Sequence, residues 1–88
     1  MLGRTGIQCP PNLGGHQLES IDLFDGPPSR MIGVYPGWGG WPLYKWRFPD
    51  GVYLVCSYLG TTATKEFRLP DTVRACWFGN DWPHVTCR

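Results

Sequence analysis

The stretch VYLVCSY, residues 52–58, is strongly β-prone, because valine and tyrosine supply four of its seven side chains. The sequence PDG at residues 49–51 supplies a tight turn before it, and Gly60 supplies one after it. Residues 61–69, TTATKEFRL, then begin with β-branched side chains that suit a partner strand. This order predicts consecutive antiparallel hairpins around residues 52–58.

Short strands on either side extend the predicted sheet. LESIDLF, residues 18–24, alternates apolar and polar side chains with the period of a strand. Residues 43–48 do the same, so we expect Tyr44, Trp46 and Phe48 to face the core. Further strands are expected at residues 31–35, 73–78 and 84–87. Turn signals recur at the roughly 8–12-residue spacing of small β folds, which predicts an all-β antiparallel meander, sandwich or open barrel of about six short strands.

The totals favour one small domain. A chain of 88 residues builds a single hydrophobic core, so we expect residues 1–88 to form one β domain, with residues 1–16 as an arm or loop ahead of the sheet. The 12 glycines and 9 prolines leave little room for helices. A formal charge of +1 provides no long-range field, which argues against nucleic acid as a partner.

Four cysteines predict disulfides rather than a metal site. Cys9, Cys56, Cys76 and Cys87 include no C-x-x-C pair, the spacing that structural zinc usually needs; zinc and free thiols are the alternatives. Small exported domains cross-link limited cores in this way. Three pairings are open to four cysteines; our interpretation joins Cys56 to Cys76 within one meander and Cys9 to Cys87 at the chain ends.

Aromatic side chains on a loop are the candidate binding residues. YPGWGGW, residues 35–41, interleaves Tyr35, Trp38 and Trp41 with glycine and proline, and Trp82 follows a later turn. Flat aromatics on loops are typical of protein or sugar contacts. The alternative is that Trp38 and Trp41 fold back over an undersized core, where we also expect Trp77.

Nothing in the sequence predicts catalysis, a metal or a cofactor. His16 and His84 stand in no H-E-x-x-H motif, and Asp25 and Asp50 precede glycine in turns. The glycines of residues 37–40 lack the order of a phosphate-binding loop. The exposed cations are interpreted as the wet face of the sheet: Lys45, Arg47, Lys65, Arg68 and Arg74.

Several short motifs resemble an uncharacterised family of small exported proteobacterial proteins named after a Salmonella locus. They are Cys9-Pro10, Leu23-Phe24-Asp25-Gly26-Pro27-Pro28, Trp46, Leu54-Val55-Cys56-Ser57-Tyr58 with Gly60-Thr61, Leu69-Pro70 and Cys76. The chain departs from the family pattern in the short interval after Cys9 and in the additional Cys87. The resemblance implies export to the periplasm and carries no active site.

These observations predict a periplasmic or secreted protein-binding module, not an enzyme. In its most concrete form it is an immunity or inhibitor protein that occludes a cell-wall-degrading toxin or lysozyme. The alternatives are a glycan or peptidoglycan binder that uses Trp38, Trp41 and Trp82, and a structural envelope protein. The chain holds no apolar run of membrane-span length, and residues 1–8 lack the apolar core of a signal peptide.

Overall fold

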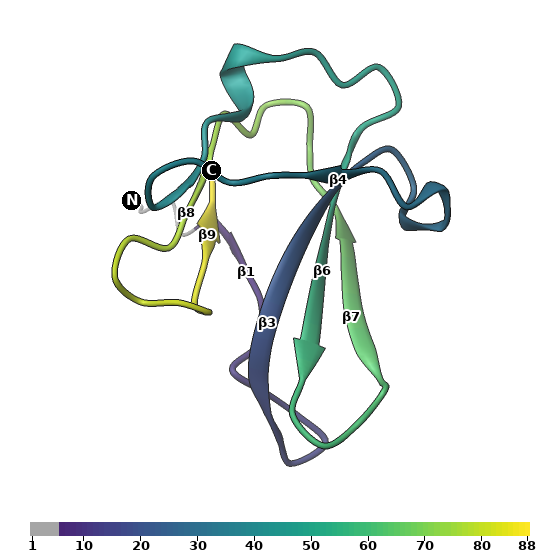
Figure 1. The fold of residues 1–88 in the computed structure, drawn as a ribbon, viewed down its shortest axis with the longest axis vertical. Helices are drawn as coiled ribbons and strands as arrows, with labels where there is room; N and C mark the ends of the chain where they lie inside the picture. Colours follow the sequence, from purple (N-terminus) through teal and green to yellow (C-terminus); the bar gives the residue numbers. More distant parts are fainter. Residues whose placement is uncertain (1–5) are drawn as a thin grey trace.

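The computed structural model describes residues 6–88 and is built from two antiparallel β-sheets with no α-helix in that range (Figure 1). No helix among these residues is long and apolar enough to cross a membrane. The elements are β1 (Ile7–Gln8), β2 (Asn12–Leu13), β3 (His16–Asp25), η1 (Pro28–Arg30), β4 (Gly33–Val34), β5 (Gly40–Trp41), η2 (Leu43–Lys45), β6 (Val52–Tyr58), β7 (Thr64–Arg68), β8 (Cys76–Trp77) and β9 (Thr86–Cys87), where η marks a 3-10 turn. The predicted all-β fold is confirmed.

The larger sheet is centred on β3 and β6. These two strands pair from Leu18 opposite Tyr58 to Asp25 opposite Val52. β7 pairs with the other edge of β6, while β2 and β4 pair with the two ends of β3. Of the two hairpins predicted around residues 52–58, the one with residues 61–69 is confirmed as β6 and β7. The one through the turn at residues 49–51 is wrong, because the other edge of β6 pairs with β3. Figure 1 shows β3, β6 and β7 as the long strands of the molecule.

A bulge in β3 keeps its apolar side chains on one face. The pairing with β6 shifts register between Leu18 and Ser20, so Glu19 is an extra residue. Leu18 and Ile21 are three residues apart, yet both are buried, as is Leu23. Without the extra residue, strict alternation would turn Leu18 to the opposite face from Ile21.

The smaller sheet collects short strands from both ends and from the middle of the chain, in the order β1, β9, β8 and β5. β1 and β2 lie inside the arm predicted at residues 1–16, so residues 7–8 and 12–13 pair into the smaller and the larger sheet. Residues 1–5 of that arm lie outside the described residues. The core fills the space between the sheets and includes all four cysteines.

The disulfides are Cys9–Cys56 and Cys76–Cys87, so the predicted formation of two disulfides is confirmed and the predicted pairing is wrong. Cys76 and Cys87 lie directly opposite each other on β8 and β9, which brings their side chains together. Cys9 follows β1 of the smaller sheet, whereas Cys56 lies in β6 of the larger one. One disulfide therefore joins the two sheets, and the other lies within a sheet.

The strand predicted at residues 43–48 does not form. Pro42 and Pro49 border it and cannot donate to a strand ladder, and the chain instead turns, with Trp46 N–H donating to the Leu43 carbonyl. Leu43 is buried, whereas Tyr44 and Trp46 are exposed, which reverses the predicted facing of these side chains. Only Phe48 packs against the core as expected.

We expect loss of the Cys9–Cys56 disulfide to cost more stability than loss of Cys76–Cys87. The two bonds close loops with separations of 47 and 11 residues, which in the chain-entropy model correspond to about 4 and about 3 kcal/mol. Urea unfolding of Cys9→Ala/Cys56→Ala and of Cys76→Ala/Cys87→Ala measures both. The reverse order of stabilities would show that loop entropy is not the dominant effect.

Tyr58 provides a pH-dependent contact. Its ring is buried, its hydroxyl donates to the Pro10 carbonyl oxygen at 2.7 Å, and burial raises the pKa of its phenol. The folded state therefore holds this proton more tightly than the unfolded state, so stability is full below about pH 10 and falls as the pH rises above it.

We expect Tyr58→Phe to cost about 1 kcal/mol at neutral pH and to reduce the alkaline loss of stability. Urea unfolding between about pH 7 and pH 11 tests this. Tyr35→Phe, which changes an exposed side chain, is the control. An unchanged alkaline slope in Tyr58→Phe would contradict the assignment.

Candidate partner-binding surface

Residues 35–41 connect the two sheets and display Trp38 at the tip of a tight turn. After β4 the chain runs across the molecule towards β8 and the C-terminus (Figure 1). The Gly37 N–H donates to the Gly40 carbonyl at 2.7 Å, and Gly39 takes a positive φ of 73° that suits glycine. The indole of Trp38 is 99% exposed.

The Trp38 turn is fixed to the smaller sheet through the two glycines that follow Trp38. The Gly39 carbonyl accepts hydrogen bonds from the N–H groups of Phe78 and Gly79, at 2.8 and 3.0 Å. Gly40 pairs with Trp77, and a β-carbon on Gly40 would lie within 2.9 Å of the Trp77 backbone. Close approach of the strands therefore requires glycine at residue 40. The turn thus holds an exposed indole on an ordered backbone.

Trp41, predicted as a binding residue, is part of the core. It is 2% exposed, and its Nε1–H donates to the Val34 carbonyl at 2.6 Å. Its ring packs edge-on against Phe78 at 5.7 Å between ring centroids. Trp41 follows Gly40 in β5, so alternation turns its side chain inward. Of the two predicted interpretations of this loop, Trp41 follows the core interpretation and Trp38 the exposed one.

Tyr35 and Trp82 border the same hollow in the protein surface. Trp82 packs edge-on against Phe78 at 4.9 Å, so Trp41, Phe78 and Trp82 form a row from the core to the surface. The hollow has a volume of about 340 Å³ and also includes Met31 from the segment after η1. Tyr35 is 88% exposed and Met31 82% exposed. The structure therefore brings Tyr35 and Trp82 together, with Trp38 three residues beyond Tyr35.

A family model for the type VI secretion system Tli immunity protein matches residues 10–88. The chain belongs to this Tli immunity family. A protein of Azospirillum brasilense, described as "Uncharacterized 16.3 kDa protein in trpG 5'region", is 50% identical over 36 residues, which cover 36% of this chain and 24% of that protein. This chain thus spans about a quarter of the curated relative that it matches. No solved structure matches the chain.

The predicted class of immunity protein is confirmed by the family, whose model describes an immunity protein of the type VI secretion system. The narrower resemblance to a family named after a Salmonella locus stays a prediction. The family gives no support to the alternative of glycan binding.

Trp77 is an exposed residue that the sequence interpretation placed in the core. Its side chain is 47% exposed and lies over Gly40, on the outer face of the smaller sheet. The neighbouring Cys76 is fully buried in its disulfide, so strand alternation points Trp77 outward. The signal in the sequence that could have revealed this exposure is the adjacent Cys76, because the strand neighbour of a buried residue points to the opposite face.

His16 and the four cysteines of the protein are held in structural contacts. The Nδ1 of His16 lies 2.8 Å from the Leu59 carbonyl oxygen, and all four cysteines are in disulfides. Within residues 6–88, no group of three histidine, cysteine or acidic side chains is arranged to hold a metal ion. Arg30 pairs with Asp50 at 2.7 Å, and this hydrogen bond raises the arginine pKa.

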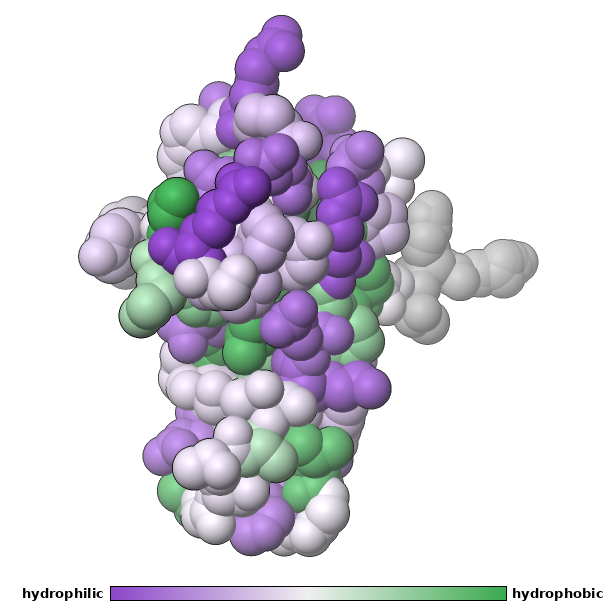
Figure 2. Space-filling view, turned by 90° about the vertical axis from the view of Figure 1, so that its right-hand side faces the viewer, coloured by the Kyte–Doolittle hydropathy of each residue, from purple (hydrophilic) through white to green (hydrophobic). Residues whose placement is uncertain are grey.

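Exposed apolar side chains gather in residues 31–38 rather than over β7. Figure 2 shows the side of the molecule on the right of Figure 1, where β7 lies, and hydrophilic and neutral side chains cover most of it. β7 is an edge strand whose exposed side chains include Lys65, Glu66 and Arg68. Charges of this kind protect a sheet edge from pairing with other chains. The aromatic surface is therefore the stronger candidate for contact with a partner.

We expect Trp41 and Trp38 to differ sharply in their effects on stability. Trp41→Ala leaves a cavity in the core and removes the hydrogen bond to the Val34 carbonyl, which costs about 3–5 kcal/mol. Trp38→Ala changes an exposed side chain and should alter stability by less than about 0.5 kcal/mol. Thermal unfolding followed by near-ultraviolet circular dichroism compares them. Equal losses would contradict the opposite burial of the two indoles.

Proposed function

We propose that the immunity protein works in the periplasm, where it binds its cognate type VI toxin through an aromatic surface formed by Tyr35, Trp38 and Trp82. The observation that carries this proposal is the 99% exposure of Trp38 on a turn held by backbone hydrogen bonds. Burying so large a ring at an interface releases much apolar surface from contact with water, and its rigid backbone loses little entropy on binding.

In this arrangement Trp38 is the main apolar contact with the toxin, and Tyr35 and Trp82 are supporting contacts. Tryptophan and tyrosine are enriched among the residues that dominate binding energy at protein interfaces. Tyr35 and Trp82 border the hollow next to the Trp38 turn, so a side chain of the toxin can enter between them. The buried Trp41 holds this surface in place, because its hydrogen bond to the Val34 carbonyl fixes the strand that leads into Tyr35.

Occlusion of the toxin, without catalysis by the immunity protein, is the mechanism that we propose. The side chains of His16 and the four cysteines are engaged in structural contacts, which supports a binding role. The two buried disulfides fit an oxidising compartment, which supports the periplasm as the place of action. The sequence analysis predicts a cell-wall-degrading toxin, and such a toxin would act in the periplasm.

Capture of the toxin tests the proposal first. The oxidised immunity protein is used as bait in the secreted fraction of type VI-active cells, and mass spectrometry identifies what it retains. The retained protein is purified, its toxicity in the periplasm is tested, and its affinity is measured by calorimetry. Failure to retain any protein that is toxic on its own and neutralised by the immunity protein would sink the proposal.

We expect Trp38→Ala to weaken toxin binding by about 2 kcal/mol or more, which is roughly 30-fold, and Tyr35→Ala to weaken it less. The matched control is Leu59→Ala, because Leu59 is also exposed and apolar but lies at the β6–β7 turn. Calorimetry measures all three, and protection of cells that produce the toxin gives an independent readout. Wild-type affinity in Trp38→Ala would move the interface away from this turn.

A further inference from the structure

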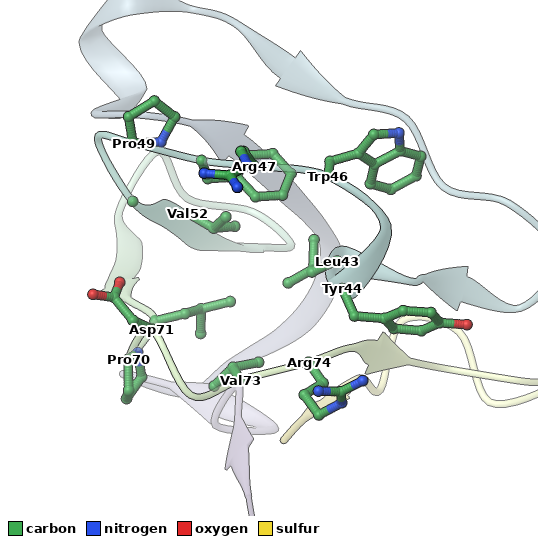
Figure 3. A pocket seen from close by; sticks show the side chains of 13 residues that line it. Leu43, Tyr44, Trp46, Arg47, Pro49, Val52, Pro70, Asp71, Val73 and Arg74 are labelled. Atoms are coloured by element: carbon green, nitrogen blue, oxygen red, sulfur yellow. The ribbon is translucent and has the colours of Figure 1, made fainter.

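A second surface lies apart from the aromatic one, between the segment that joins β5 to β6 and the segment that joins β7 to β8. It is a groove of about 590 Å³. Its floor is apolar and includes the buried side chains of Leu43, Val52 and Leu69. The two segments are tied together by the Tyr44 N–H, which donates to the Arg74 carbonyl at 2.9 Å. Figure 3 shows Tyr44 and Arg74 at one end of the groove and Asp71 at the other.

Arginine side chains surround this groove. Arg47 and Arg74 line it, and the Arg74 guanidinium lies 5.4 Å from the centre of the Tyr44 ring. Arg68 reaches the same rim, because a β-carbon on the lining residue Gly51 would lie 2.9 Å from its Cζ atom. The only acidic lining residue is Asp71. The lining itself holds two arginines against one aspartate, a formal charge of +1, and Arg68 adds a further cation at its rim.

These arginines have no carboxylate partner within the part of the chain that the structure describes. The one ion pair in residues 6–88 joins Arg30 to Asp50, outside this set. Arg74 is held by the face of an aromatic ring, which leaves its N–H groups free to bind an acceptor. A planar guanidinium matches a carboxylate with two parallel hydrogen bonds, and the apolar floor lowers competition from water.

We propose that this groove receives an acidic segment of the cognate toxin, whose carboxylates pair with Arg47 and Arg74 while an apolar side chain covers the floor. This inference rests on the proposed function, since it names a second contact with the same partner. A protein segment fits better than nucleic acid or a lipid surface, because the cations are few and local and the whole chain carries a charge of only +1. The apolar floor of the groove suits an apolar side chain of the toxin segment.

Charge reversal with the captured and purified toxin tests the inference. We expect Arg74→Glu and Arg47→Glu each to weaken toxin binding at least tenfold, with a loss that shrinks at high salt. Lys65→Glu is the matched control, because Lys65 is an exposed cation on β7, away from the groove, and it should change affinity by less than threefold. Circular dichroism and thermal unfolding confirm that each variant is folded.

A compensating change in the toxin identifies the occupant directly. Acidic residues of the toxin are replaced singly by lysine, and at least one such variant should bind Arg74→Glu more tightly than the wild-type toxin does. Wild-type affinity in both arginine variants would overturn the inference. The inference would also be overturned if toxin affinity is unchanged while both variants lose binding to phosphatidylglycerol vesicles or lose self-association in sedimentation.

The outcomes separate this inference from the proposed function. If Trp38→Ala weakens toxin binding and the arginine variants do not, the aromatic surface stands and the groove has no role in it. If the arginine variants weaken binding and Trp38→Ala does not, the groove is the main interface. If the wild-type protein retains no toxin at all, both proposals fall together.

Discussion

The inner face of β6 is the constraint on which the rest of the molecule depends. Leu54, Cys56 and Tyr58 alternate along this strand and are each 2% exposed or less. Cys56 is bonded to Cys9, and the Tyr58 hydroxyl binds the Pro10 carbonyl, so neighbouring residues of one strand hold the start of the chain. A chain of this size has a small core, and covalent attachment between its sheets offsets the limited area that it buries.

The surface that we assign to toxin binding is rigid because of what lies beneath it. Trp41 fills the core and bonds Val34, while Gly40 lets β5 approach β8 closely. These two residues fix the backbone on both sides of the Trp38 turn. The exposed indole is therefore presented at little entropic cost, which is the condition under which a single aromatic anchor contributes most to affinity.

The two proposed contact regions differ in their physics. The aromatic surface offers apolar area without a nearby cluster of cations, whereas the groove combines an apolar floor with arginines that have no partner in the described residues. Apolar anchors contribute mainly to affinity, and complementary charges contribute mainly to selectivity and to the rate of association. An immunity protein needs both, because it has to bind one toxin tightly and leave unrelated proteins alone.

The sequence by itself determined the all-β class, the strand at residues 52–58, the presence of disulfides and a glycine-rich aromatic loop, because each follows from local propensity, alternation or composition. Only the tertiary structure decided which cysteines pair, since sheet register brings Cys76 opposite Cys87 and leaves Cys9 beside Cys56. It also separated Trp38 from Trp41, which share one glycine-rich loop, because a close strand pairing at Gly40 sends one indole outward and the other inward. The arginine groove joins residues that are far apart in the chain, so no local pattern could predict it.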